Sequence, residues 1–223
     1  MSCALCQLRK EKRFCPAVHG RICGQCCGEQ REVTLDCPSE CPYLQQAREH
    51  EKPRATSAVD RATLFPAVEI AEQFLYEREH LILGLSFALA KSARSGRSLD
   101  GHVLADRDLI DALTALAQSY QTRVESSLIY ERPMTNLAHQ QIAREVETML
   151  KEFRETEQKH MGYSRLRDSE VLKALVFLLR MGLARTSGRP KSRAFVDFLF
   201  RQFPENPSPI ATPEASGSRI VIP

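Results

Sequence analysis

The feature that most constrains this chain is the crowding of all eight cysteines into its first 41 residues, in a sequence of 223. The cysteines are Cys3, Cys6, Cys15, Cys23, Cys26, Cys27, Cys37 and Cys41. The opening stretch, MSCALCQLRKEKR, lacks the apolar core of a signal peptide, so we expect a cytoplasmic location. In a reducing compartment, cysteines at this density indicate metal binding rather than disulfides.

The spacing of the cysteines is typical of tetrahedral thiolate sites. Two pairs are separated by two residues and a third pair by three, namely Cys3 and Cys6, Cys23 and Cys26, and Cys37 and Cys41. A two-residue separation lets two sulfurs from one tight turn reach one ion at about 2.3 Å. Eight thiolates fill two four-sulfur sites, which predicts two Zn²⁺ per chain. An iron–sulfur cluster, which also uses four cysteines, is the alternative.

The spacing leaves open which cysteines share an ion. A cross-brace arrangement places Cys3, Cys6, Cys23 and Cys26 in one site, and Cys15, Cys27, Cys37 and Cys41 in the other. Adjacent Cys26 and Cys27 point in different directions, so they can serve different metals. Two histidines are alternative ligands: His19, three residues beyond Cys15, in place of Cys27, and His50 as a weaker substitute.

Residues 3–44 resemble the small cross-brace zinc modules of the HIT, MYND and B-box type. The shared features are Cys3-x2-Cys6, Phe14-Cys15-Pro16 and Ile22-Cys23-x2-Cys26. The chain departs from them in the single Cys15, the doubled Cys26-Cys27 and a closing pair without histidine. The resemblance implies a protein-interaction or scaffold element. The whole chain is also similar to an uncharacterised bacterial family that joins such a finger to a helical region, which implies no activity.

The sequence divides into four parts. Residues 1–52 form the zinc-binding module, 53–64 a linker, 65–203 a helical bundle and 204–223 a flexible Pro-rich tail. About forty residues bury too little surface to fold alone, so metal is expected to supply the folding energy of the module. Within it, the alternation in residues 31–35 predicts a short strand, and Pro42 begins a helix. In the tail, residues 220–222 could dock on a sheet edge or groove.

From Phe65 onward, apolar residues recur with the helical period. We expect helices over 66–93, 106–131, 136–159, 168–186 and 192–203, with Asp106 capping the second and Gly162 ending the third. Residues 171–183 are apolar nearly all round, which indicates the most buried helix. The fold class is therefore mainly α: a two-zinc cross-brace module followed by an antiparallel helical bundle with short loops.

No catalytic motif stands out. The sequence lacks a G-x-S-x-G turn, a Walker loop, a G-x-G-x-x-G loop and an H-E-x-x-H pair. Glu77 with His80 and Glu157 with His160 have the spacing of di-iron ligands, but their neighbours are charged, so outward faces are expected. The longest apolar run has ten residues, about half of the ~20 that a membrane span needs. We therefore expect neither an enzyme nor a membrane protein.

Charge is concentrated near the C-terminal helices. Residues 165–203 carry nine Lys or Arg against three acids, and the turn that holds Arg185, Arg189, Lys191 and Arg193 is the candidate contact for phosphate or nucleic acid. The alternative is a solvated loop opposing a helix dipole. With eight thiolates and two Zn²⁺, the finger itself carries a charge of about −3 and would repel a phosphate backbone.

These observations favour a non-enzymatic zinc-binding protein whose finger is structural and serves protein–protein interaction or scaffolding. The partner protein is not specified by the sequence. A zinc–thiolate redox switch, motivated by the adjacent Cys26 and Cys27, is one alternative. Nucleic-acid binding through residues 185–193 is the other.

Overall fold

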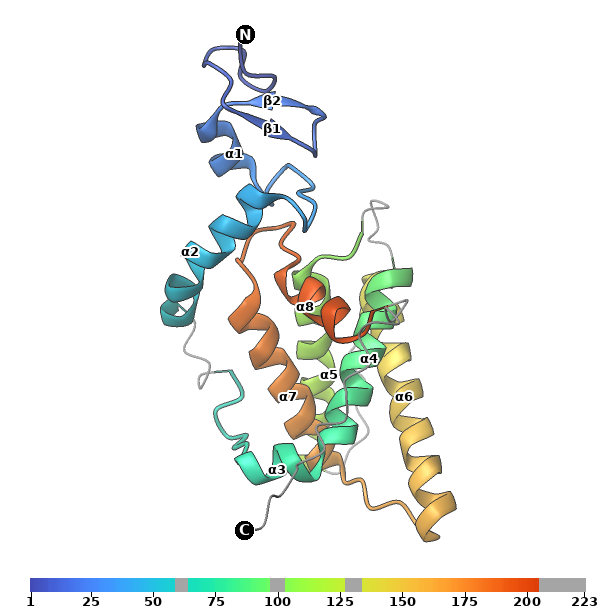
Figure 1. The fold of residues 1–223 in the computed structure, drawn as a ribbon. Helices are drawn as coiled ribbons and strands as arrows, with labels where there is room; N and C mark the ends of the chain where they lie inside the picture. The colour runs from blue at the N-terminus through green and yellow to red at the C-terminus, as the bar shows by residue number, and fades with distance from the viewer. Residues whose placement is uncertain (59–63, 97–102, 127–133, 205–223) are drawn as a thin grey trace, which may run out of the picture.

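The computed structural model describes residues 1–58, 64–96, 103–126 and 134–204. Over these ranges the chain is mainly α-helical, with one two-stranded sheet in the cysteine-rich N-terminal region, which confirms the expected fold class (Figure 1). Residues 59–63 of the expected linker and the tail from residue 205, with its segment 220–222, lie outside the described residues.

The N-terminal region is a small unit of strands and helices. Strands β1 (Arg13–Cys15) and β2 (Gly20–Ile22) pair antiparallel, and helix α1 (Gly24–Gln30) follows directly. Helix α2 (Pro42–Ala58) begins at the proline that the sequence indicated, because the ring presets a helical φ and the missing N–H is not needed there. It continues past residue 52 to Ala58, so the described part of the expected linker is helical. The domain boundary at residue 52 stays a prediction.

The expected strand over residues 31–35 is wrong, because this segment is a turn. The amide groups of Val33, Thr34 and Leu35 all donate to the carbonyl oxygen of Gln30, at the end of α1. Glu32 adopts a left-handed φ of 54° and is buried. Its carboxylate pairs with Arg48 and Ser187, which lie outside the segment and which an alternation of side-chain polarity does not reveal.

Over the described residues from 64 onward, six helices form a second, helical unit. They are α3 (Glu72–Glu77), α4 (Glu79–Ser95), α5 (Asp106–Ser126), α6 (Leu137–Met161), α7 (Asp168–Arg185) and α8 (Ala194–Gln202). The single helix expected over 66–93 is interrupted at Arg78, whose φ of −117° leaves the helical region. The Arg78 guanidinium bonds Glu170 in the first turn of α7 at 2.7 Å. The break between α3 and α4 therefore lies where the chain contacts the start of α7.

The helix directions correct one detail of the expected bundle. α4 runs antiparallel to α6, and α5 to α7, but α5 and α6 run parallel (Figure 1). The parallel pair is evident because Asp108 faces His139 near both starts, and Tyr120 bonds Glu147 further along both helices.

The apolar core lies between these helices. α7 carries buried side chains on most of its surface, as the sequence indicated, and α5 packs along it. Gly162 ends α6 with a left-handed φ of 78°, which a glycine adopts without steric cost. Asp106 begins α5, which it was expected to cap. Its carboxylate instead accepts hydrogen bonds from the backbone amides of Phe195 and Val196, so it caps the start of α8.

Candidate metal centre

Four cysteines converge where the N-terminal turn meets the β-hairpin and α1. Cys3 and Cys6 lie in the turn before the hairpin, Cys23 follows β2, and Cys26 lies in the first turn of α1. The thiol of Cys23 caps α1 by accepting the Cys26 amide at 3.4 Å, and the Cys23 amide donates to Cys3 Sγ at 3.2 Å. The backbone thus aims N–H groups at sulfur, as in turns that hold thiolates.

The geometry of this tetrad fits a tetrahedral metal ion. The sulfurs of Cys3, Cys6, Cys23 and Cys26 all lie within 4.8 Å of one another. An ion with four sulfurs at about 2.3 Å would separate them by roughly 3.8 Å, which is compatible with that limit. Cys3, Cys23 and Cys26 are buried and Cys6 is partly exposed, and none of the eight cysteines forms a disulfide. This tetrad could hold a metal ion, as the sequence predicted.

The electrostatics of the tetrad favour ionised sulfur at part of the site. Burial opposes ionisation of Cys3, but hydrogen bonds from the backbone of Cys6, Cys23 and Leu5 outweigh it and lower the pKa of Cys3 to about 6. The Cys26 amide lowers the pKa of Cys23. Cys26 donates its thiol to Cys23, and this bond, together with burial, raises the pKa of Cys26 to about 12. A cation that bound here would meet ionised sulfur at Cys3 and would displace the protons that remain.

Two arginines place positive charge beside the thiols. The Arg9 guanidinium lies 3.9 Å from the sulfurs of both Cys23 and Cys26. Arg13 donates to Cys27 Sγ at 3.8 Å and stacks on the Tyr43 ring, with 4.3 Å from its guanidinium carbon to the ring centroid. A four-thiolate site with one Zn²⁺ carries a charge of −2, which such neighbours partly compensate. Neither Arg9 nor Arg13 was predicted as part of the site, although their position among eight thiols was a signal.

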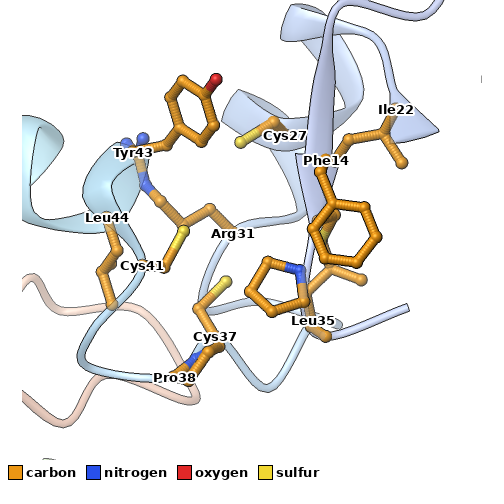
Figure 2. A pocket seen from close by; sticks show the side chains of 13 residues that line it. Phe14, Ile22, Cys27, Arg31, Leu35, Cys37, Pro38, Cys41, Tyr43 and Leu44 are labelled. Carbon is orange, nitrogen blue, oxygen red and sulfur yellow. The ribbon is translucent and has the colours of Figure 1, made fainter. Parts of the chain in front are cut away.

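The other four cysteines line one apolar pocket between the hairpin and the start of α2. Figure 2 shows Cys27, Cys37 and Cys41 around it, from α1 and from the segment that leads into α2. Its lining is Phe14, Cys15, Pro16, Ala17, Ile22, Cys27, Arg31, Leu35, Cys37, Pro38, Cys41, Tyr43 and Leu44. Burial raises the pKa of Cys37, and negative charge on Cys15, Cys41 and Glu32 adds to the shift. Within the described ranges, these four sulfurs do not form a cluster of the first tetrad's tightness.

The histidines lie away from both groups. His19 is exposed, in the tight turn between β1 and β2, and it is not part of the pocket that Cys27 lines. His50 is exposed on α2. The two Glu-x-x-His pairs are not brought together in any metal-binding cluster that the described residues form. Glu157 instead accepts hydrogen bonds from Ser164 and the backbone that follows α6.

The basic turn lies against the finger rather than in open solvent. Arg189 donates to the carbonyl oxygens of Gly28 and Arg31, at 2.9 and 2.7 Å. Lys191 bonds the carbonyl of Thr34 at 2.9 Å and Asp36 at 3.0 Å.

The other two cations of the turn lie over aromatic rings of α8. Arg185 stacks 3.6 Å from the centroid of Phe198, and Arg193 lies 5.9 Å from that of Phe200. All four cations therefore have partners within the chain. This pairing was not predicted, because the partners of Arg189 and Lys191 lie about 160 residues away; the only signal in the sequence was the opposite charge of the two regions.

Comparison with known proteins adds no assignment. The chain matches no known family, no curated protein and no solved structure. No helix among the described residues has the length and apolar character to cross a membrane.

Proposed function

We propose that this chain is a zinc-binding protein whose finger is structural. The observation that carries the proposal is the convergence of four thiols, from Cys3, Cys6, Cys23 and Cys26, within 4.8 Å of one another. A closed four-thiolate set favours Zn²⁺ among the divalent ions, and interleaved pairs are more typical of zinc modules than of iron–sulfur clusters. A small unit with few apolar residues of its own gains its folding energy from such an ion.

A second Zn²⁺ completes the proposal, held by Cys15, Cys27, Cys37 and Cys41. These thiols line one pocket, and negative charge on Cys15 and Cys41 contributes to the raised pKa of Cys37. Both observations support a common ligand set. Binding would draw the four sulfurs together from their present spacing. Exposed His19, outside this pocket, is a poorer ligand than Cys27.

The role that we assign to the finger is protein–protein interaction without catalysis. Eight thiolates saturate two zinc ions, so neither ion keeps the open position that catalytic zinc requires. The finger exposes large apolar side chains, with Leu8 at 87% and Phe14 at 53% exposure. Such residues suit contact with a protein partner. A cytoplasmic location stays a prediction.

Nucleic-acid binding and a redox switch are the two alternative functions, and each requires a different change in the protein. Nucleic-acid binding through residues 185–193 would require Arg189 and Lys191 to leave their bonds with the finger. A redox switch requires peroxide to oxidise the thiolates and release zinc. Release of zinc by millimolar peroxide, with refolding after thiol reduction, would favour the switch over a permanent scaffold.

Native mass spectrometry and elemental analysis of the full chain test the proposal. We expect two zinc ions per wild-type chain. Cys23→Ser and Cys37→Ser should each weaken binding of one ion, whereas Ser39→Ala, in the same loop as Cys37 and Cys41, should retain both. A wild-type protein that purifies folded and free of metal, or with cystines in place of thiols, would refute the zinc assignment. A pull-down with wild type beside Cys23→Ser then tests the interaction role.

A further inference from the structure

One loop of the helical unit supports the α1 helix of the finger. The 187–193 loop, which connects α7 to α8, includes Arg189 and Lys191. Arg189 bonds the carbonyls of Gly28 and Arg31, which are among the groups left without a helical partner at the end of α1. A guanidinium at this position also opposes the negative end of the helix dipole. The last turn of α1 is thereby capped from outside the finger.

The same helix carries thiols of both cysteine groups. Cys23 caps its start, Cys26 belongs to the tetrad, and Cys27 lines the second pocket. α1 has seven residues, too few to be stable as an isolated helix. Its direction is therefore set by the metal ligands at one end and by Arg189 at the other. A shift of either end would move the sulfurs of Cys26 and Cys27.

A buried carboxylate reinforces this contact. Glu32 is 1% exposed and follows the end of α1. Its carboxylate accepts hydrogen bonds from Arg48 of α2 at 2.8 Å and from Ser187 at 2.9 Å, and its carbonyl accepts the Lys191 amide at 2.8 Å. Arg48 also bonds Asp197 of α8 at 2.7 Å. Glu32 thus joins the finger, α2 and the 187–193 loop through charged bonds that removal of one partner would leave unsatisfied.

The loop is equally well fixed to the helical unit. Ser192 is buried, its hydroxyl donates to Asp106 at 2.7 Å, and its carbonyl accepts the Asp106 amide at 2.8 Å. The Ser187 amide donates to the Ser192 hydroxyl at 3.1 Å. Because Asp106 belongs to the first turn of α5, the loop transmits the position of α1 to the start of α5 and of α8.

Metal loading would change the charge that faces this loop. With its thiols protonated, the finger over residues 1–52 carries about +1, from eight basic and seven acidic side chains. With eight thiolates and two Zn²⁺ it carries about −3. The basic 187–193 loop, which already bonds the finger through Arg189 and Lys191, is therefore attracted more strongly to the loaded finger than to the empty one.

We propose that metal binding by the finger and docking of the 187–193 loop are one coupled equilibrium, with Arg189 as a positioning residue for the metal centre. The proposal rests on the zinc-binding function inferred above. Coupling is reciprocal, so a loop that strengthens metal binding must itself be held more tightly when metal is bound. The finger thus depends on the helical unit, and the loop senses the metal state of the finger.

Cobalt titration of the full chain tests the first half of the coupling. Co²⁺ in a thiolate site gives visible absorption bands, and competition with a chelator yields its affinity. We expect Arg189→Gln to weaken Co²⁺ binding about ten- to a hundredfold, the usual effect of losing an outer-sphere support. Arg189→Lys, which keeps the charge, should recover part of the affinity. The matched control is Arg144→Gln, on the exposed face of α6, which should bind as wild type does.

Hydrogen exchange of the wild-type chain tests the second half without any variant. Adding a chelator should accelerate exchange of the amides of residues 187–196 and leave α6 unchanged. If wild type takes up no Co²⁺, the proposed function fails first. If wild type binds Co²⁺ but Arg189→Gln binds within twofold of it, or if chelation leaves exchange at 187–196 unchanged, the coupling is refuted. Should Arg189→Gln fail to fold, the Arg189→Lys affinity and the wild-type exchange data decide the question.

Discussion

Removing the Asp106 carboxylate should destabilise the protein far more than removing an average polar side chain. Asp106 is fully buried and accepts three hydrogen bonds, from the Ser192 hydroxyl at 2.7 Å and from the Phe195 and Val196 amides at 3.0 Å each. In Asp106→Ala these three donors lose their acceptor, at about 1–3 kcal/mol each. Release of a buried charge offsets part of this cost, so we expect a net loss of about 3–5 kcal/mol.

Two milder variants separate the contributions that the charge and the individual hydrogen bonds of Asp106 make to stability. Asp106→Asn keeps one oxygen for the two amides, and Ser192 can turn its hydroxyl to accept from the new amide group, so the expected loss is about 1 kcal/mol. Ser192→Ala removes one of the three donors and also leaves the Ser187 amide without an acceptor, which predicts a loss of about 1–3 kcal/mol.

Urea unfolding of the metal-loaded protein, followed by circular dichroism, measures these differences. A loss of 4 kcal/mol would lower the midpoint by roughly 1–2 M. Burial raises the pKa of Asp106 above its ordinary value of 3.8. The folded state therefore binds this proton more tightly, and the associated stability is present below pH 3.8 and lost as pH rises through the folded pKa. Asp106→Asn should lack this dependence. An Asp106→Ala protein within 1 kcal/mol of wild type would refute the reasoning.

Three further predictions concern other parts of the chain. Gly162→Ala should cost about 1–2 kcal/mol, because φ is 78° there, whereas Gly28→Ala, in a helix with open space around its Cβ, should not destabilise; urea midpoints compare them. Burial, with the nearby charge of Glu147, raises the pKa of Tyr120 to about 12, so stability should fall as pH rises from about 10 through 12, and Tyr120→Phe should remove that fall. The metal-loaded chain should show no salt-dependent binding to RNA or DNA, since Arg189 and Lys191 already bond the finger; affinity that falls steeply with salt would contradict this.

Features that depend on local chemistry were predictable from the sequence. The tetrad follows from paired cysteines in tight turns, the end of α6 from Gly162, and the burial of α7 from its apolar surface. The break at Arg78 and the turn after α1 were not predictable in the same way. The break at Arg78 lies at an ion pair with Glu170, 92 residues away, and the turn after α1 buries Glu32 against Arg48 of another helix. Asp106 was expected to cap α5 for the same reason, because its partners in α8 lie about 90 residues away in the sequence.

The charge distribution shows how such distant pairing hides in a sequence. Taken separately, an excess of basic residues around Arg189 indicated phosphate, and the negative charge of a zinc-loaded finger argued against it. The structure brings these two features together, because Arg189 and Lys191 bond carbonyls and a carboxylate of the finger itself. Opposite charges on two parts of one chain are as good a reason for an internal contact as for an external ligand. A basic turn in a protein with a thiolate-rich module should therefore be tested first as the partner of that module.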